Sequence, residues 1–552
     1  MAKSQLAYGV SLAAIAVMML GATAQAQNVA AAQAGGGFQR GGGGHHHNGG
    51  GNGGHSGANP GAVDPGIRGG APGAGQPLPG ISSDQMNFFT VAQGTFNDVD
   101  TPATGLGPGF NLDSCGGCHA FPAAGGSSPP TNNPQIAVAT AMGATNVVPS
   151  FVTANGPIRE ARFVLNPDGT PDGGVHDLFS IAGRSDAQGC DLAQPDFATQ
   201  LANHNVIFRI PPPTYGDGLI ESLSDATLQA DFDAQAQQKA SLGVSGGFNT
   251  SGNTGNKTRF GWKAQNISML MFAGEAYNAE QGVTNELFPN ERNNPDASCQ
   301  LNALPEDATP LTDAAPSASQ SADFNSDIVQ FAMFMRLLAA PTPAIPLNIP
   351  SGGTASASAS TTAASTSTAT TTDPAATTTD PTAAATTPAS TPVAMASVLP
   401  TAAGSSTTST AAAAASSAAS SATSINAGLQ AFINVGCAAC HTVTHTTGNS
   451  ALGTGATNVT VNSFSDYAIH NMGSGLADRV TQGNANGFMF RSAPLWGVGQ
   501  RAFFLHDGRT SDLVQAIEQH ASSGSEANQV IGQFNMLSTT DQQNILNFLR
   551  NL

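Results

Sequence analysis

The residues of this chain that could do chemistry at a fixed spacing form two copies of the pattern Cys-x-x-Cys-His: Cys115, Cys118 and His119 in the first, and Cys437, Cys440 and His441 in the second. In this pattern the two thiols bond covalently to haem vinyl groups, and the adjacent imidazole binds the iron. A redox Cys-x-x-Cys or half of a zinc site would carry the same thiols beside an accidental His. With only six Cys and twelve His, about a thousandth of one such motif is expected by chance. The two motifs therefore predict two covalently bound haem c groups.

The sixth ligand of each iron decides its chemistry, because a protein ligand favours electron transfer whereas an open position admits a substrate. For the second haem we expect His520, which lies on the apolar face of an expected helix; the alternative is a core His bonded to a carbonyl. His470 is the main competing ligand. We expect His445 to lie too close to the motif to reach across the haem, and His506 to hold a turn.

For the first haem no equivalent His or Met stands out. His176 and His204 are candidates, but both lie in segments without helical periodicity. We therefore expect an open iron at the first haem. Glu221 is our candidate acid/base above it, and an exposed surface carboxylate is the alternative interpretation.

Changes in composition divide the chain into five segments. We expect a signal peptide over 1–26, a Gly/His-rich disordered segment over 27–81, an N-terminal haem domain over 82–346, a disordered linker rich in Ser, Thr, Ala and Pro over 347–423, and a C-terminal cytochrome c domain over 424–552. The expected fold class is mainly α, with two cytochrome c-like haem domains and long loops.

Three helices are expected around the second motif. The first is capped by Ser424 and delivers Cys437, and the last runs from about Ser538 to the end of the chain. These two helices should pack across each other. Between them, Thr510 or Ser511 should cap a helix that carries on one face Leu513, Ala516, Ile517 and His520.

Charge and targeting signals limit the partners and the location. The net charge is −18, which argues against nucleic acid and anionic membranes. No later stretch is apolar enough to span a membrane. The signal peptide predicts export to the periplasm, where Cys190 and Cys299 are expected to form a disulfide rather than remain free thiols.

The sequence also contains a weak internal repeat. Residues 208–218 resemble residues 490–499, with one residue inserted, and each copy lies downstream of its own motif. The repeat indicates two related haem domains, each with an Arg and an aromatic residue near its haem. Chance similarity between loops rich in Pro and Gly is the alternative.

Together with the motifs, five further stretches carry a family resemblance: residues 105–111, 259–265, 284–289, 493–497 and 504–509. They resemble the di-haem oxidoreductase family, whose members are also named peroxidases or thiol oxidoreductases. This family is related to bacterial di-haem cytochrome c peroxidases. The resemblance implies a peroxidatic N-terminal haem and an electron-relaying C-terminal haem. It also implies a Trp between the haems, with Trp262 favoured over Trp496, and a calcium ion whose ligands we cannot assign. The linker is not part of the family pattern.

These observations predict an enzyme that reduces hydrogen peroxide or another small oxidant with electrons from a small donor protein. The first alternative is a di-haem protein that only transfers electrons, with both irons six-coordinate. The second is a di-haem oxygenase or protein-modifying enzyme, which would use the same open iron on an organic substrate.

Overall fold

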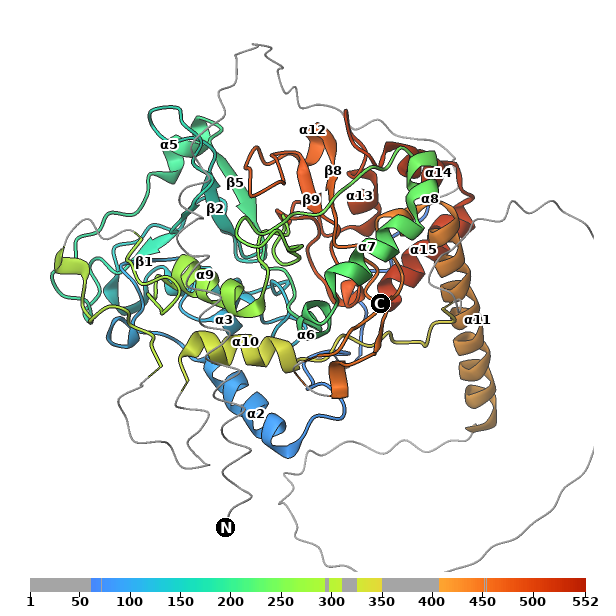
Figure 1. Cartoon of the computed structure of the whole chain (residues 1–552), viewed down its shortest axis with the longest axis horizontal. Helices are drawn as coiled ribbons and strands as arrows, with labels where there is room; N and C mark the ends of the chain where they lie inside the picture. The colour runs from blue at the N-terminus through green and yellow to red at the C-terminus, as the bar shows by residue number, and fades with distance from the viewer. Residues whose placement is uncertain are drawn as a thin grey trace, which may run out of the picture. The chain divides into compact units, whose positions relative to one another are not determined.

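The computed structural model describes residues 61–70, 72–292, 297–309, 325–349, 407–450, 452 and 454–552. The expected signal peptide and most of the Gly/His-rich segment and of the linker lie outside these residues. Both motifs belong to one compact unit, Met1–Ala355 with Ala422–Leu552. Helices predominate over short strands in the described part (Figure 1), in agreement with the expected mainly helical class, while the cytochrome c-like character of the two domains stays a prediction. Within that part, no helix is both long enough and apolar enough to cross a bilayer.

Three helices form the core that supports the first motif: α2 (Ser83–Asn97), α9 (Met269–Gln281) and α10 (Asp327–Leu337). Helix α10 packs against both of the others (Figure 1). The last turn of α2 brings the ring of Phe96 to 6.1 Å from the ring of His119. The motif is thus attached to the largest apolar cluster of the unit.

The other elements of the N-terminal region are short. The helices are η1 (Pro102–Thr104), α3 (Cys115–Cys118), α4 (Pro134–Val138), η2 (Ala141–Gly143), α5 (Phe197–Ala202), α6 (Asp217–Glu221), α7 (Asp225–Ala234), α8 (Ala236–Ser241) and η3 (Ala297–Cys299). The strands are β1 (Gly109–Phe110), β2 (Glu160–Phe163), β3 (Val175–His176), β4 (Phe179–Ser180) and β5 (Val206–Arg209). β1 pairs with β4, and β2 lies between β3 and β5, all antiparallel.

The C-terminal region has a similar mixture. Its helices are α11 (Thr407–Asn434), η4 (Cys437–Ala439), η5 (Thr454–Ala456), α12 (Gly473–Leu476), η6 (Val498–Gln500), α13 (Leu513–Glu518), α14 (Asn528–Met536) and α15 (Thr539–Asn551). Its strands form two antiparallel pairs, β6 (His445–Thr446) with β7 (Thr460–Val461), and β8 (Ile469–Asn471) with β9 (Met489–Arg491).

The first and last helices of the C-terminal region pack across each other, as predicted. They approach most closely at Gly428 of α11, where a Cβ atom would collide with the backbone carbonyl of Asn544 in α15. The rings of Phe432 and Phe548 then pack at 5.4 Å in the same apolar cluster. Helix α15 begins directly after its N-cap Ser538, where the sequence placed it.

Two helix starts differ from the prediction. Helix α11 begins at Thr407, so Ser424 lies inside it and not at its cap. The preceding segment, assigned to the linker, is rich in Ala, which has the highest helix propensity. Helix α13 is capped by Asp512. The hydroxyl of Thr510, two residues earlier, accepts the backbone N–H of Asp512. This helix ends at Glu518, so His520 lies just beyond it.

The two segments of the internal repeat fold alike. In each copy a strand ends at an Arg, and a Gly with φ of +72° then begins a short helix, Gly216 before α6 and Gly497 before η6. The copies also touch reciprocally. A Cβ on Gly216 would press on the Trp496 ring, and one on Gly497 would contact the Tyr215 ring. This shared geometry favours a true repeat over chance similarity.

The repeat also links the two regions through buried charges. Arg209 Nη2 lies 2.9 Å from Asp478 Oδ2, and Lys263 Nζ lies 2.9 Å from Asp478 Oδ1. In the opposite direction, Arg491 of the C-terminal region faces the buried Asp217 of the N-terminal region. The two motif-bearing regions therefore share a charged interface within one unit.

Candidate functional site

The first motif presents its side chains from a single helical turn. Ser114 caps α3 by accepting the Gly117 N–H. His119 Nδ1 lies 2.9 Å from the Gly126 carbonyl oxygen, which orients the ring. Burial lowers the pKa of His119 to about 4, against the opposing effect of nearby carbonyls. The imidazole is therefore neutral at ordinary pH, as an iron ligand must be.

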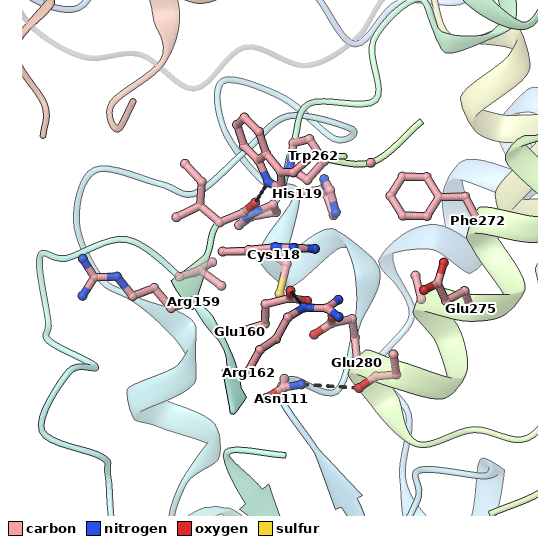
Figure 2. Close-up of a pocket in the computed structure, with 18 of the residues that line it drawn as sticks. Asn111, Cys118, His119, Arg159, Glu160, Arg162, Trp262, Phe272, Glu275 and Glu280 are labelled. Atoms are coloured by element: carbon pink, nitrogen blue, oxygen red, sulfur yellow. Dashed lines mark hydrogen bonds and ion pairs between the residues drawn. The ribbon is translucent and has the colours of Figure 1, made fainter. Parts of the chain in front are cut away.

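Beside this motif lies a hollow, which we call the His119 hollow (Figure 2). Its lining includes Cys118, His119, Glu160, Arg162, Trp262 and Glu280. Two thiols in one turn, a neutral imidazole and an adjacent space fit a covalently bound haem. Among the described residues, the Nε atoms of Arg209 and Arg491 are buried without a partner. Arg209 lines the hollow, so its positively charged guanidinium suits a cofactor that carries acidic groups.

A pair of carboxyl groups faces the His119 hollow. Glu160 on β2 and Glu280, the next-to-last residue of α9, are hydrogen-bonded to each other. Arg162 Nε lies 2.6 Å from Glu160 Oε1 and outweighs burial, so the pKa of Glu160 falls to about 2. Burial and the Glu160 charge raise the pKa of Glu280 well above its usual range. These shifts favour the protonated form of Glu280, and the pair lies close to Cys118 (Figure 2).

The other side chains predicted for the first haem lie elsewhere. Glu221, in α6, accepts hydrogen bonds from Arg336 and from the Met269 N–H and is not among the residues lining the His119 hollow. His176 stacks on a Phe ring and contacts Asp172, and the ring of His204 is exposed. The carboxylates beside His119 thus come from β2 and α9, and not from α6.

The carboxyl pair was missed in the sequence. Glu160 and Arg162 are two residues apart in a strand, so their side chains share a face, and this was the one available local signal. Nothing in the sequence connects Glu280 with them, because the contact depends on how α9 packs.

The second motif is held in the same way as the first. His441 Nδ1 lies 2.9 Å from the Phe464 carbonyl oxygen. His520 Nδ1 lies 2.7 Å from the Ala516 carbonyl oxygen, one helical turn earlier. Burial and the neighbouring His520 lower the pKa of His441 to about 4. His520 is therefore near His441, in an environment that suits its predicted role as the sixth ligand, which stays a prediction.

The competing histidines have other partners. Both ring nitrogens of His470 are engaged by carboxylates, Asp466 and Glu526, each at 3.1 Å. His445 lies between Asp231 and a backbone carbonyl. His506 stacks on an aromatic ring in the turn where we expected it to act structurally. His445 and His506 therefore have structural contacts, whereas His470 also hydrogen-bonds Cys440 and acts on the pKa of His441, so it stays the competing ligand at the second motif.

Trp262 lies between the two motif regions. It lines the His119 hollow and donates its indole N–H to the Ile210 carbonyl (Figure 2). Its ring contacts the ring of His506 edge-on at 6.4 Å, and His506 stacks on Phe490 at 4.3 Å. Trp496 is instead part of the large apolar cluster. The structure thus places Trp262, and not Trp496, beside the first motif.

Two expectations outside the haem sites have different outcomes. The disulfide between Cys190 and Cys299 is present, with an S–S distance of 2.05 Å. Among the described residues, no group of three or more His, Cys, Asp or Glu side chains is arranged to hold a metal ion. The calcium implied by the resemblance therefore stays without assigned ligands.

Comparison with known proteins gives one match. The family model described as "Di-haem oxidoreductase, putative peroxidase" matches residues 357–552. This stretch contains the second motif and His520, and it starts inside the segment assigned to the linker. No curated protein and no solved structure matches the chain. Over residues 357–552, the chain is therefore similar to the di-haem oxidoreductase family.

Proposed function

We propose that this protein reduces hydrogen peroxide at the His119 hollow, with electrons relayed from a donor protein through the haem of the second motif. The observation that carries the proposal is the asymmetry of the two sites. A carboxyl pair that shares one proton faces the hollow beside His119, whereas a second imidazole, His520, lies near His441. An acid beside one iron suits catalysis, and two imidazoles at the other suit electron transfer.

The reaction consumes two electrons and two protons for each peroxide and releases two molecules of water. Cys115, Cys118 and His119 would hold a haem here, which would supply the redox chemistry for cleavage of the O–O bond of peroxide. Glu280 donates the proton that the departing oxygen needs. Glu160, kept ionised by Arg162, holds this proton in place between turnovers.

Electrons reach the His119 hollow through the interface between the two regions. Trp262, His506 and Phe490 form a continuous row of rings there. The Trp262 indole is fixed by its hydrogen bond to Ile210, so its contact with His506 is maintained. We propose this row as the path between the haems.

The location of this chemistry follows from the first residues of the chain. We propose that segment 1–26 directs export and that the protein acts in the periplasm. The disulfide between Cys190 and Cys299 supports an oxidising compartment, and covalent haem attachment is compatible with it.

Spectroscopy of the purified di-haem protein tests the assignment. We expect one high-spin and one low-spin iron by EPR. In His520→Ala the low-spin signal should be lost, and the exposed His204→Ala should leave both signals unchanged. Two low-spin irons without peroxide turnover would contradict the proposal and favour a protein that only transfers electrons. An unchanged spectrum in His520→Ala would show that another group is the sixth ligand.

A further inference from the structure

A second hollow lies beside β1 and β4. Its charged lining comes from β3 and the segment after α9, namely His176, Asp177, Glu291 and Arg292. The first hollow and this one are neighbours in the fold. Gly109 lines the second hollow and Asn111 lines the first, so the chain at β1 forms part of the wall between them.

Arg292 connects the second hollow with the end of α9. Its Nη1 atom lies 3.2 Å from Asp177 Oδ1 and 2.5 Å from the carbonyl oxygen of Ala279. The charge of Arg292 acts on Glu280, the residue after Ala279, and opposes the effects of burial and of Glu160 on the pKa of Glu280. The acid that faces the first hollow is therefore coupled to the charged groups of the second.

Peroxide reduction needs protons at the Glu160–Glu280 pair, which a haem in the His119 hollow would separate from solvent on that side. Glu160 and Glu280 are both partly buried, and both line the His119 hollow. A haem that fills this hollow displaces the water through which the pair would otherwise exchange protons. Protons must then arrive from another side, where the second hollow is large enough to hold several water molecules.

We propose that the second hollow is the proton entrance of the enzyme, and that Glu291 takes up protons from solvent and passes them, through water and Asp177, to the Glu160–Glu280 pair. This inference rests on the proposed peroxide reduction. Each turnover moves two protons along this route, and the two electrons come from the donor protein through the second haem. The products are two molecules of water, so atoms and charges balance.

The surroundings of Glu291 suit this role. The carboxyl group is half-buried and lines the hollow, so it is open to water on one side. Burial, together with the charges of Glu306 and Asp177, raises its pKa to about 7, and Arg292 acts in the opposite direction. His176 is the other titratable group of the lining. A carboxyl group with this pKa can both take up and release a proton near neutral pH.

The test compares Glu291→Gln with Asp191→Asn in the di-haem protein. Asp191 is an exposed carboxylate next to the lining residue Leu192, but it does not line the hollow. We expect Glu291→Gln to lower peroxide turnover at least about tenfold and to remove an inflection near pH 7, with unchanged optical spectra. Formate should restore turnover partly, because it can enter the hollow and carry protons. Glu291→Asp should retain most of the activity, and Asp191→Asn should match the wild type.

A second measurement separates this inference from the proposed function. The infrared C=O band of protonated Glu280, identified by its loss in Glu280→Gln, should exchange in D2O more slowly in Glu291→Gln than in the wild type. Equal exchange rates, or turnover that stays at the wild-type level, would overturn the proton route. Lost turnover without formate rescue and with unchanged exchange would also overturn it. A wild type that consumes no peroxide would refute the proposed function, while the exchange rates would still decide the route.

Discussion

At the scale of single residues, the proton on Glu280 is the most direct target. Glu280→Gln keeps the size of the side chain and a donor toward Glu160, but removes the acid. We expect peroxide turnover to fall about 10²- to 10⁴-fold, while the optical spectrum of the first haem stays unchanged. Stopped-flow measurement of peroxide consumption gives the comparison. Glu275→Gln is the control, because Glu275 lines the same hollow but accepts a hydrogen bond from Asn266. Equal losses in both variants would contradict the role of Glu280.

The residues that could be predicted were those with a local signal. His119 and His441 follow from their motifs, and the prediction of His520 used the apolar face of its helix. Glu160 and Glu280 could not be paired in advance, since they lie on β2 and in α9, 120 positions apart in the numbering. Glu221 looked equally plausible as a carboxylate, and only the packing of α6 shows that Arg336 binds it.

At the scale of elements, one carboxylate joins three segments around the second motif. Glu526, before α14, accepts the backbone N–H groups of Ser245, Gly246 and Asn471. It also forms an ion pair with His470 on β8 at 3.1 Å. Although burial acts in the opposite direction, these partners lower the pKa of Glu526 from 4.5 to about 2.

This lowered pKa predicts how stability depends on pH. A carboxylate whose pKa is lowered in the folded state stabilises the protein at pH values above its pKa in the unfolded state. That contribution is lost as the pH falls toward the folded-state pKa. We therefore expect the melting temperature of the wild type to drop between pH 5 and pH 2, and the drop to be smaller in Glu526→Gln. Thermal unfolding followed by circular dichroism measures both. The exposed Glu518→Gln should follow the wild-type curve, and a parallel curve for Glu526→Gln would refute the expectation.

Element boundaries were predicted well where a cap and an apolar face coincide. Helix α15 has both, and it begins directly after Ser538. Helix α11 begins at Thr407, well before Ser424, because a run of Ala extends a helix without any apolar periodicity. The preference of Ser and Thr for loops suggested a linker there, and the propensity of Ala outweighed it.

At the scale of the whole molecule, Asp478 is one of the buried carboxylates that connect the two motif-bearing regions. Asp478 belongs to the C-terminal region, and its oxygens lie 2.9 Å from Arg209 and 2.9 Å from Lys263 of the N-terminal region. All three side chains are almost completely buried. The sequence repeat indicated two related domains, but it held no sign of this cross-connection, which exists only when both copies have folded against each other.

Removing the Asp478 charge should therefore destabilise the unit as a whole. Asp478→Asn removes the directly bonded counter-charge of two buried cations, and losing one partner of a buried ion pair costs about 3–5 kcal/mol. We expect the midpoint of denaturant unfolding to shift to a lower concentration, with a single transition at both haems. The absorbance changes of the two haems measure this transition. The exposed Asp84→Asn should shift the free energy of unfolding by less than about 0.5 kcal/mol. If Asp478→Asn splits unfolding into two steps, the regions fold independently and this charge only docks them. If stability is unchanged, neighbouring carbonyls such as those of Asn486 and Met489, which already accept from Lys263, neutralise the cations alone.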